Sequence, residues 1–286
     1  MRTLEDLLTK EYLARLEHLG QRLRARLGTD GYSGARRSTT KGTSLEFSDF
    51  REYLPGDDLR RADWNSYARF EKLYIRQYFE EKQAAFHIFL DCSRSMEAGE
   101  KFLRAKALAA SVAYLAMSGG DQVHLFAFRE GLSAREGGLS QQSRFLQAVR
   151  FLQPLTAEGG TDLFRAVRET GPLQKGVSLI FSDFMTEGRT DDAIKLLQEK
   201  KQTVILVQVL SKEELSPSAQ GPIRLVDSET GQALDVEMTA GVLAAYHKAL
   251  EQQEKGWQEF CRRRNALFLR TAEDAPLLET VYEIMK

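Results

Sequence analysis

The stretch that decides the fold is Phe86-His87-Ile88-Phe89-Leu90-Asp91-Cys92-Ser93-Arg94-Ser95. The apolar run at residues 84–90 is typical of a buried strand. This strand ends at a carboxylate, two hydroxyls follow at every second position, and a helix is predicted at 101–118. In an open α/β sheet, ligands bind beyond the carboxyl ends of the strands. We therefore expect a binding site at this strand end, formed by Asp91, Ser93 and Ser95.

Two later segments supply further oxygen atoms at similar places. Gly159-Gly160-Thr161-Asp162 opens a predicted helix, and a predicted strand at 177–181 is followed by Ser182-Asp183. Carboxylates and hydroxyls are hard oxygen donors, which suit Mg²⁺ or Mn²⁺ and not zinc. The alternative interpretation is that Asp91 and Ser95 only cap a helix and that Asp183 is a solvated loop acid. The candidate metal ligands are Asp91, Ser93, Ser95, Thr161 and Asp183.

The order of these residues resembles a known metal site. Asp-x-Ser-x-Ser, followed by Thr and then by Asp, is similar to the metal-ion-dependent adhesion site of von Willebrand factor A domains. The pattern is specific because three separate strand or helix ends agree. The resemblance implies a von Willebrand factor A-type domain with bound Mg²⁺ or Mn²⁺. It also implies an open coordination position, which water or an acidic residue of a protein partner fills.

Strands and helices alternate along the chain from residue 83 onward. This alternation predicts a doubly wound, mostly parallel α/β sheet with helices on both faces. Two short runs near 222–236, joined by a turn that contains Gly231, predict an inserted β-hairpin. The predicted strands are 84–90, 123–128, 177–181, 203–210 and 266–269, and the predicted helices are 101–118, 141–152, 161–170, 191–200, a long helix capped by Thr239, and 276–285.

The first 82 residues are predicted to form an N-terminal part of helix, loop and strand that packs on a main domain at 83–286. Apolar residues recur there at steps of four and three: Leu4, Leu8, Tyr12, Leu16, Leu19, Leu23 and Leu27. They predict one amphipathic helix, docked on its own body or on a second copy, with recruitment of a partner as the alternative. Residues 28–42 are predicted to form a loop and residues 73–79 a strand.

Residues 46–64 carry the pattern Glu-Phe-x-x-x-Arg-Glu-Tyr-x-Pro-Gly-Asp-Asp-x-Arg-x-x-Asp-Trp, and Ala68-Arg69 follow. Together with the metal-site pattern, this run resembles the bacterial family called domain of unknown function fifty-eight, over most of the chain from about Gly42. The resemblance implies a von Willebrand factor A-like domain that works with a MoxR-type AAA+ ATPase. The family tends to have Thr-Gly after the Ala-Arg pair, whereas this chain has Phe70-Glu71.

Acids and bases are mixed around Tyr53 and Trp64 in the same run. Buried charges need partners. We therefore expect ion pairs that lock this segment onto the main domain, with Trp64 and Arg60 contributing to stability. The alternative is an exposed docking surface. The charged residues are Arg51, Asp57, Asp58, Arg60, Arg61 and Asp63.

Composition limits the class of protein. The chain has 286 residues with 42% hydrophobic content, enough for a sizeable core, and its formal net charge of -1 argues against binding nucleic acid or anionic membranes by charge alone. Its two cysteines, Cys92 and Cys261, form no zinc pattern and no disulfide framework. The sequence predicts neither a signal peptide nor a transmembrane segment. We expect a soluble cytoplasmic protein.

The patterns of common catalytic sites are missing from the sequence. It contains no Gly-x-x-x-x-Gly-Lys-Ser/Thr run and no Gly-x-Ser-x-Gly run. His87 and His124 are predicted to pack inside strands, and Cys92 is predicted to fill space at a strand end. We therefore predict binding and not catalysis.

The predicted function is a metal-dependent protein-interaction module. By family resemblance, it would act with a MoxR-type AAA+ ATPase in the assembly or activation of a client complex. Two alternatives stay open, which are metal-assisted hydrolysis at the same site and RNA binding through the basic segment 22–41.

Overall fold

The computed structural model describes residues 3–29, 37–41, 47–81, 83–185, 189–219, 221–226 and 231–286. The chain divides into two compact units. The main unit contains Met1–Arg24 and Ala85–Lys286, and the small unit contains Ala25–Ala84. The division predicted from the sequence, 1–82 and 83–286, assigns the N-terminal helical residues to the first part, whereas their contacts are with the main unit.

The main unit is built on a six-stranded sheet in the order β11-β8-β7-β4-β5-β6. Every strand pair in it is parallel except β5 with β6. The predicted doubly wound, mostly parallel α/β fold is therefore confirmed, and the antiparallel edge strand β6 is an addition that was not predicted. The strands are β4 (Ala85–Asp91), β5 (Gln122–Phe128), β6 (Leu132–Leu139), β7 (Gly176–Ser182), β8 (Gln202–Leu210) and β11 (Leu267–Ala272).

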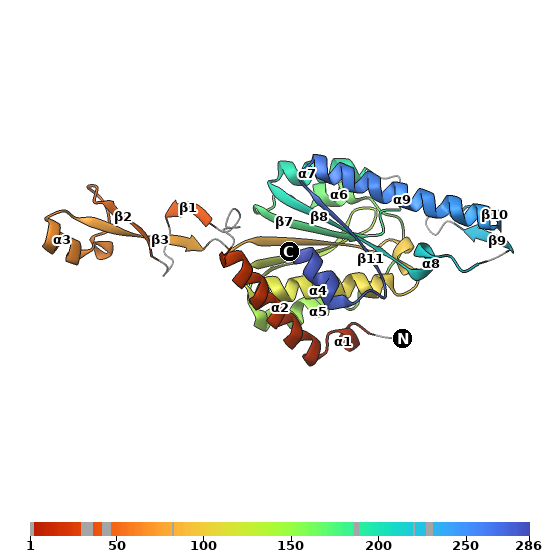
Figure 1. The fold of residues 1–286 in the computed structure, drawn as a ribbon, viewed down its shortest axis with the longest axis horizontal. Helices are drawn as coiled ribbons and strands as arrows, with labels where there is room; N and C mark the ends of the chain where they lie inside the picture. The colour runs from red at the N-terminus through yellow and green to blue at the C-terminus, as the bar shows by residue number, and fades with distance from the viewer. Residues whose placement is uncertain are drawn as a thin grey trace. The chain divides into compact units, whose positions relative to one another are not determined.

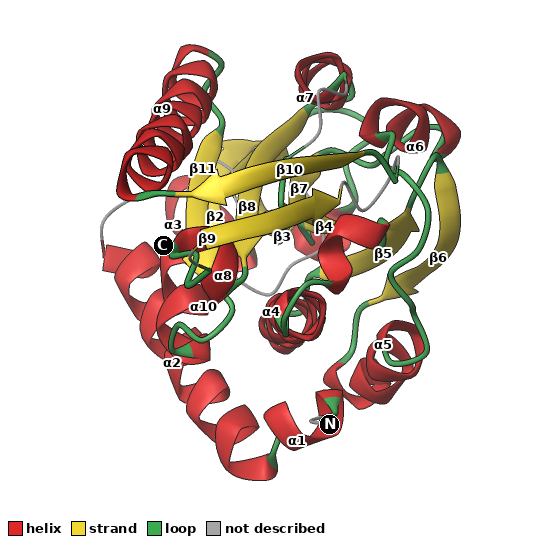
Figure 2. Ribbon diagram, turned by 90° about the vertical axis from the view of Figure 1, so that its right-hand side faces the viewer, coloured by secondary structure: helices red, strands yellow, loops and turns green. Residues whose placement is uncertain are grey.

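Helices cover both faces of this sheet (Figures 1 and 2). One face carries α4 (Lys101–Ser118), α5 (Phe145–Leu152) and α10 (Leu277–Met285). The other carries α6 (Leu163–Glu169), α7 (Thr190–Glu199) and α9 (Ala240–Arg263). Helix α4 is rich in alanine and buried along almost its whole length, because small side chains let it lie between the sheet and the outer helices.

The N-terminal apolar stripe forms two helices, α1 (Leu4–Leu7) and α2 (Lys10–Thr29). The prediction of one continuous helix is wrong, because Leu8 leaves the helical conformation and the Thr9 hydroxyl accepts a 3.2 Å hydrogen bond from the Tyr12 amide, which caps α2. The predicted docking on the chain's own body is confirmed. Leu4 and Leu16 are buried, and the Tyr12 hydroxyl lies 2.8 Å from that of Ser111 on α4.

The predicted hairpin is present as β9 (Gly221–Val226) and β10 (Ala233–Met238), which pair antiparallel in a two-stranded sheet of their own. It follows the short helix α8 (Lys212–Leu215) and precedes α9. The amide of Val242 donates to the Thr239 hydroxyl, so Thr239 caps α9 as predicted. In Figure 2, β9 and β10 cross in front of the end of the large sheet.

Short 3₁₀ turns complete the chain. They are η1 (Leu59–Arg61) in the small unit and η2 (Arg94–Glu97) and η3 (Gln142–Arg144) in the main unit. None of the helices in the described ranges has both the length and the apolar character of a membrane span.

The described part of the small unit contains a three-stranded antiparallel sheet in the order β1-β3-β2 and the helix α3 (Trp64–Phe70). The strands are β1 (Arg37–Lys41), β2 (Phe47–Glu52) and β3 (Tyr74–Glu81). The strand predicted at 73–79 is confirmed. The predicted loop at 28–42 is wrong at 28–29, which end α2, and at 37–41, which pair with β3. Residues 30–36 and 42 lie outside the described part.

Ion pairs order the turn of the small unit. The Arg51 guanidinium donates a 2.6 Å hydrogen bond to Oδ2 of Asp57, and that oxygen also accepts from the Leu54 amide at 2.8 Å. Arg76 contacts Asp63 at 2.6 Å. Of the charged residues in the prediction, Arg51 and Asp57 therefore pair with each other, and Asp63 pairs with Arg76 of β3; these ion pairs lie within the small unit.

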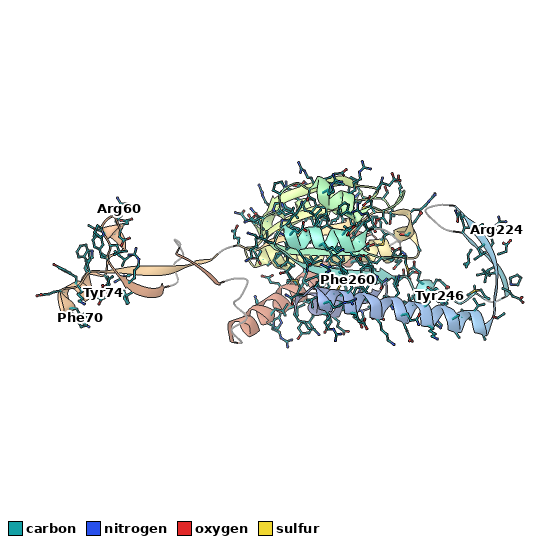
Figure 3. All side chains as sticks on the ribbon, turned by 90° about the horizontal axis from the view of Figure 1, so that it is seen from above. Arg60, Phe70, Tyr74, Arg224, Tyr246 and Phe260 are labelled. Atoms are coloured by element: carbon teal, nitrogen blue, oxygen red, sulfur yellow. The ribbon has the colours of Figure 1, made fainter. Side chains whose placement is uncertain are left out.

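Trp64 is 57% exposed within the described chain, so its ring is not buried within the small unit. Its ring meets that of Tyr67 edge to face with centroids 6.4 Å apart, and both rings, like Phe70, lie on the short helix α3. Figure 3 shows the labelled Arg60, Phe70 and Tyr74 on the small unit. In this unit, Ile75 of β3 is buried instead and is 5% exposed.

Candidate metal centre

Strands β4 and β7 lie side by side and in parallel, so their carboxyl ends place Asp91 next to Ser182 and Asp183. The Ser182 hydroxyl donates a 2.6 Å hydrogen bond to Oδ2 of Asp91. The backbone amide of Ser93 donates to Oδ1 of Asp91 at 2.9 Å. Both oxygens of this carboxylate, which is only 1% exposed, are thus oriented by neighbouring segments.

A third segment reaches the same carboxylate. The Thr161 hydroxyl donates to Oδ2 of Asp91 at 3.2 Å. Its loop is fixed to the first one by backbone bonds, from the Arg94 amide to the Gly159 carbonyl at 2.9 Å and from the Glu158 amide to the Cys92 carbonyl at 2.8 Å. The N-cap of α6 is the next residue, Asp162, whose side chain accepts from the Arg165 amide.

The two serines of the Asp-x-Ser-x-Ser run complete the cluster. Their hydroxyl oxygens lie 3.1 Å apart, with Ser93 fully buried and Ser95 partly exposed. Four of the five predicted ligands, Asp91, Ser93, Ser95 and Thr161, are therefore joined by hydrogen bonds. The fifth, Asp183, directly follows Ser182 and is 1% exposed, so the alternative of a solvated loop acid is wrong.

Asp183 has a partner that the sequence did not indicate. The ammonium of Lys101, the first residue of α4, donates to Oδ2 of Asp183 at 2.8 Å and to Oε1 of Glu214 on α8 at 2.5 Å. The Lys101 side chain is completely buried. No spacing rule joins these residues, because 82 and 113 positions separate Lys101 from its two partners.

Electrostatics agree with a cluster of negative charge. Burial raises the pKa of Asp91 to about 6, hydrogen bonds from Ser182 and Ser93 oppose this rise, and the negative charge of Asp183 adds to it. Burial likewise raises the pKa of the Cys92 thiol to about 12, and the charge of Asp91 adds to that rise. Cys92 is 1% exposed and packs as the predicted filler of space.

The backbone directly after Asp183 is in an uncommon conformation. Phe184 has a φ of 49°, in the left-handed region that costs a bulky residue roughly 1–2 kcal/mol. Its side chain is 5% exposed and packs against Trp257 of α9, with ring centroids 5.7 Å apart. The amide of Phe184 donates to the Ser182 hydroxyl at 3.1 Å. Strain of this kind is often found at functional sites.

Two hollows flank the cluster. The larger is a cleft of about 710 Å³, lined by Ser95 and Asp183 on the strand side and by Val226 and Gly231 of the hairpin. The smaller, of about 10 Å³, is lined by Asp91, Thr161 and Ser182 among others, and has room for about one water molecule. No histidine lies among the described residues that line either hollow.

The donor chemistry fits a small, hard cation. Two buried carboxylates and three hydroxyls meet at one end of the sheet, and the like charges of Asp91 and Asp183 influence each other. Within the described residues there is no group of three or more His, Cys, Asp or Glu side chains that could bind a metal, so the hydroxyls would have to contribute. Lys101 donates to Oδ2 of Asp183, and the Met185 amide donates to Oδ1 of the same carboxylate at 3.3 Å.

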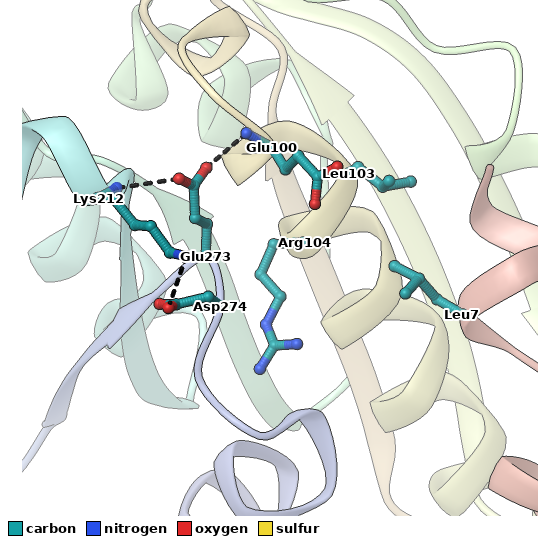
Figure 4. A pocket seen from close by; sticks show the side chains of 7 residues that line it. All are labelled: Leu7, Glu100, Leu103, Arg104, Lys212, Glu273 and Asp274. Atoms are coloured by element: carbon teal, nitrogen blue, oxygen red, sulfur yellow. Dashed lines mark hydrogen bonds and ion pairs between the residues drawn. The ribbon is translucent and has the colours of Figure 1, made fainter. Parts of the chain in front are cut away.

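A separate polar pocket of about 290 Å³ lies between α4, α8 and the loop after β11 (Figure 4). Its walls are held by bonds from the Lys212 amide to Glu273 at 3.0 Å and from the Lys212 ammonium to Asp274 at 3.1 Å. Arg104 borders it, is 7% exposed, and donates to the carbonyl of Ala275. None of the predicted metal ligands lines this pocket.

Two other predictions concern residues outside the candidate metal centre. His87 and His124 lie in β4 and β5 and stack with ring centroids 5.2 Å apart; His87 is buried as predicted, whereas His124 is partly exposed. The basic segment 22–41 lies mostly outside the residues whose side chains are described, so RNA binding stays untested.

Known proteins show the following similarities. A family model described as protein of unknown function DUF58 matches residues 49–256. The uncharacterized proteins Rv1480 of Mycobacterium tuberculosis and Mb1516 of Mycobacterium bovis are each 25% identical to this chain over 199 residues, which is 66% of this chain and 62% of theirs. The chain thus spans less than two thirds of the length of these curated relatives.

Several solved structures are similar in fold. Conserved hypothetical protein BatB from Bacteroides thetaiotaomicron is 16% identical, with a TM-score of 0.45 over 71% of this chain and 97% of that chain. A von Willebrand factor type A protein from Catenulispora acidiphila is 16% identical, with a TM-score of 0.40 over 73% and 43%. Proximal thread matrix protein 1 from the mussel byssus, with a zinc-occupied MIDAS motif, is 13% identical, with a TM-score of 0.40 over 70% and 45%. At these identities the likeness concerns the fold alone.

Proposed function

The chain belongs to the DUF58 family, and from this premise we propose that its main unit is a protein-interaction module whose binding site depends on a divalent cation. The observation that supports this most is the convergence on Asp91. Hydroxyls from two other chain segments, Ser182 and Thr161, donate to the same buried carboxylate at the carboxyl end of the sheet. Such strand ends are where α/β sheets bind ligands.

The residues proposed to bind the cation are Asp91, Ser93, Ser95, Thr161 and Asp183. Their hard oxygen atoms favour Mg²⁺ or Mn²⁺. When bound, the ion would supply a coordination position for one further oxygen atom. A carboxylate is the protein group best suited to that position, so the partner would be an acidic segment of another protein.

The chain's own residues would admit and orient that segment. The cleft beside Ser95 and Asp183 is wide enough for a side chain, and it has the apolar side chains of Met185 and Val226 on its walls. An acidic residue next to an apolar one would match these surroundings.

The finer identity of the partner comes from family resemblance. The proposed partner is a MoxR-type AAA+ ATPase, in the assembly or activation of a client complex in the cytoplasm. Capture of purified MoxR-type ATPase by the full chain, with MgCl₂ and with EDTA, tests this directly. Equal capture under both conditions would show that the interaction does not require the cation.

Calorimetric titration of MgCl₂ and MnCl₂ tests the site itself. Wild type should bind, Asp91→Asn should lose binding, and Thr161→Ala should bind more weakly. Asp162→Asn is the matched control, because Asp162 is the next residue and caps α6 without belonging to the candidate set. Heats of binding that are the same in wild type and Asp91→Asn would contradict the proposal.

A further inference from the structure

Lys101 is a completely buried lysine among carboxylates at the candidate metal centre. Its ammonium lies 2.8 Å from Oδ2 of Asp183 and 2.5 Å from Oε1 of Glu214. Asp183 is 1% exposed, and the Glu214 side chain is 24% exposed. Burial of a charge is costly unless it is paired, so each of these groups depends on the others.

We propose that Lys101 is the resident cation of this site, which keeps the acidic cluster folded without metal and lowers the affinity for a divalent ion. The inference rests on the proposed function, because it concerns the same ion. It assigns to Lys101 a positioning role through Asp183, not direct contact with a partner.

The balance of charges supports the first part of the proposal, that Lys101 keeps the acidic cluster folded without metal. Asp91 and Asp183 are both buried at adjacent strand ends, and their like charges repel. Among the described contacts of these two side chains, Lys101 contributes the one ion pair, whereas Asp91 is bonded by hydroxyls and an amide. Without Lys101, the cluster would need another cation to stay folded.

Repulsion between the Lys101 ammonium and a divalent ion supports the second part, that Lys101 lowers the affinity for that ion. A divalent ion that uses Asp183 as a ligand would lie close to the Lys101 ammonium, and like charges at such short range repel strongly in a protein interior. Glu214 offers the ammonium a second carboxylate to which it can shift. Oε2 of Glu214 accepts from the Ser211 amide at 2.7 Å, which fixes this acceptor at the start of α8.

The position of Glu214 connects the site to the cleft. Glu214 lines the same cleft as Val226 of the hairpin, and the Tyr246 hydroxyl of α9 donates to its carbonyl at 2.6 Å. Figure 3 labels Tyr246 on α9 and Arg224 on the hairpin. A shift of the Lys101 ammonium towards Glu214 would therefore alter the wall of the cleft that a partner would contact.

The test compares Mg²⁺ affinity and melting temperature, each with EDTA and with excess MgCl₂. Lys101→Met should bind Mg²⁺ at least about tenfold more tightly than wild type. Its melting temperature in EDTA should fall by about 10 °C and be restored by MgCl₂. Lys101→Arg keeps the charge and should melt in EDTA much as wild type does.

Glu214→Gln supplies the opposite prediction. Lys101 would then pair with Asp183 alone, so Mg²⁺ should bind several times more weakly than in wild type. Lys200→Met is the control, because the Lys200 ammonium bonds to the carbonyls of Val167 and Gly171 and contacts no candidate ligand in the described structure. It should leave Mg²⁺ affinity unchanged.

The outcomes separate the two proposals. If wild type binds Mg²⁺ and Lys101→Met binds it equally, the role of Lys101 is overturned while the cation site stands. If no variant, including Lys101→Met, binds Mg²⁺ or Mn²⁺, the proposed function falls as well. Should Lys101→Met fail to fold with and without MgCl₂, Glu214→Gln decides, because wild-type affinity in that variant would overturn the inference.

Discussion

The Ser182 hydroxyl donates a 2.6 Å hydrogen bond to Oδ2 of Asp91 and so joins the ends of two neighbouring strands, β4 and β7. The residues are 91 positions apart in the chain. Because the bond fixes one carboxylate oxygen, it also sets where the other side chains of the cluster can meet it. Ser182 was not among the predicted ligands, yet it orients the central one.

Ser182→Ala should lower the free energy of unfolding by about 2–3 kcal/mol, since hydrogen bonds to charged groups exceed neutral ones and the buried acceptor loses a donor. Ser178→Ala is the matched control on the same strand. Its hydroxyl is buried and donates to the neutral Gln202 side chain at 3.2 Å, so its loss should cost about 1 kcal/mol. Urea denaturation measures both, and equal losses would contradict a special role for the Asp91 contact.

Stability should depend on pH through His87. Burial lowers its pKa to about 4, and the nearby His124 adds to this, whereas Gln202 opposes it through a 3.0 Å bond to Nδ1. The unfolded chain, with a histidine pKa of about 6.5, binds more protons between these values. The contribution of neutral His87 is therefore complete above about pH 6.5 and is lost as the pH falls towards 4, by up to about 3 kcal/mol.

Comparison of His87→Leu with wild type isolates the contribution of His87 to the pH dependence of stability. The difference between their unfolding free energies should shift in favour of the variant as the pH falls from about 7 to about 4.5. His247→Gln, at an exposed position of α9, should follow the wild-type pH profile. Parallel profiles for wild type and His87→Leu would show that His87 does not titrate in this range.

Trp64→Ala should change the stability of the small unit by less than about 1 kcal/mol, because the ring is 57% exposed. Ile75→Ala, at a position 5% exposed on β3, should cost about 2–5 kcal/mol. Amide hydrogen exchange in β2 and β3 reports on this unit separately. A large loss for Trp64→Ala would mean that another surface covers the ring.

Glu71→Gly should stabilise the small unit by about 1 kcal/mol. Glu71 ends α3 with a φ of 53°, in the left-handed region that glycine adopts without strain. Glu71→Ala removes the charge without relieving the backbone, so a gain in that variant as well would point to the charge and not to the conformation.

Neither cysteine should react with a thiol reagent in the native protein. Burial raises the pKa of Cys92 to about 12 and that of Cys261 to about 11, and each side chain is 1% exposed. Both thiols should react after unfolding in urea. Rapid labelling of one thiol per chain in the native protein would show that a segment over the metal centre or over α9 opens readily.

The sequence by itself determined the architecture of the main unit. Apolar runs of strand length alternate with helical patterns, and local signals such as Thr239 mark where a helix begins. The sequence also determined which side chains gather at the site, because parallel strands end at the same edge of a sheet. Asp91 and Asp183 follow two such strands, and a hydroxyl from the loop at Thr161 reaches the first of them.

Tertiary structure alone decided how that site is charged and held. Lys101 pairs with Asp183 and Glu214 across 82 and 113 residues, and no periodicity in a chain records which distant side chains will share a buried space. The same holds for the exposure of Trp64, which depends on what covers it and not on its neighbours in sequence. Local patterns fix backbone conformation, whereas the pairing of buried charges is settled only when the folded chain excludes water around them.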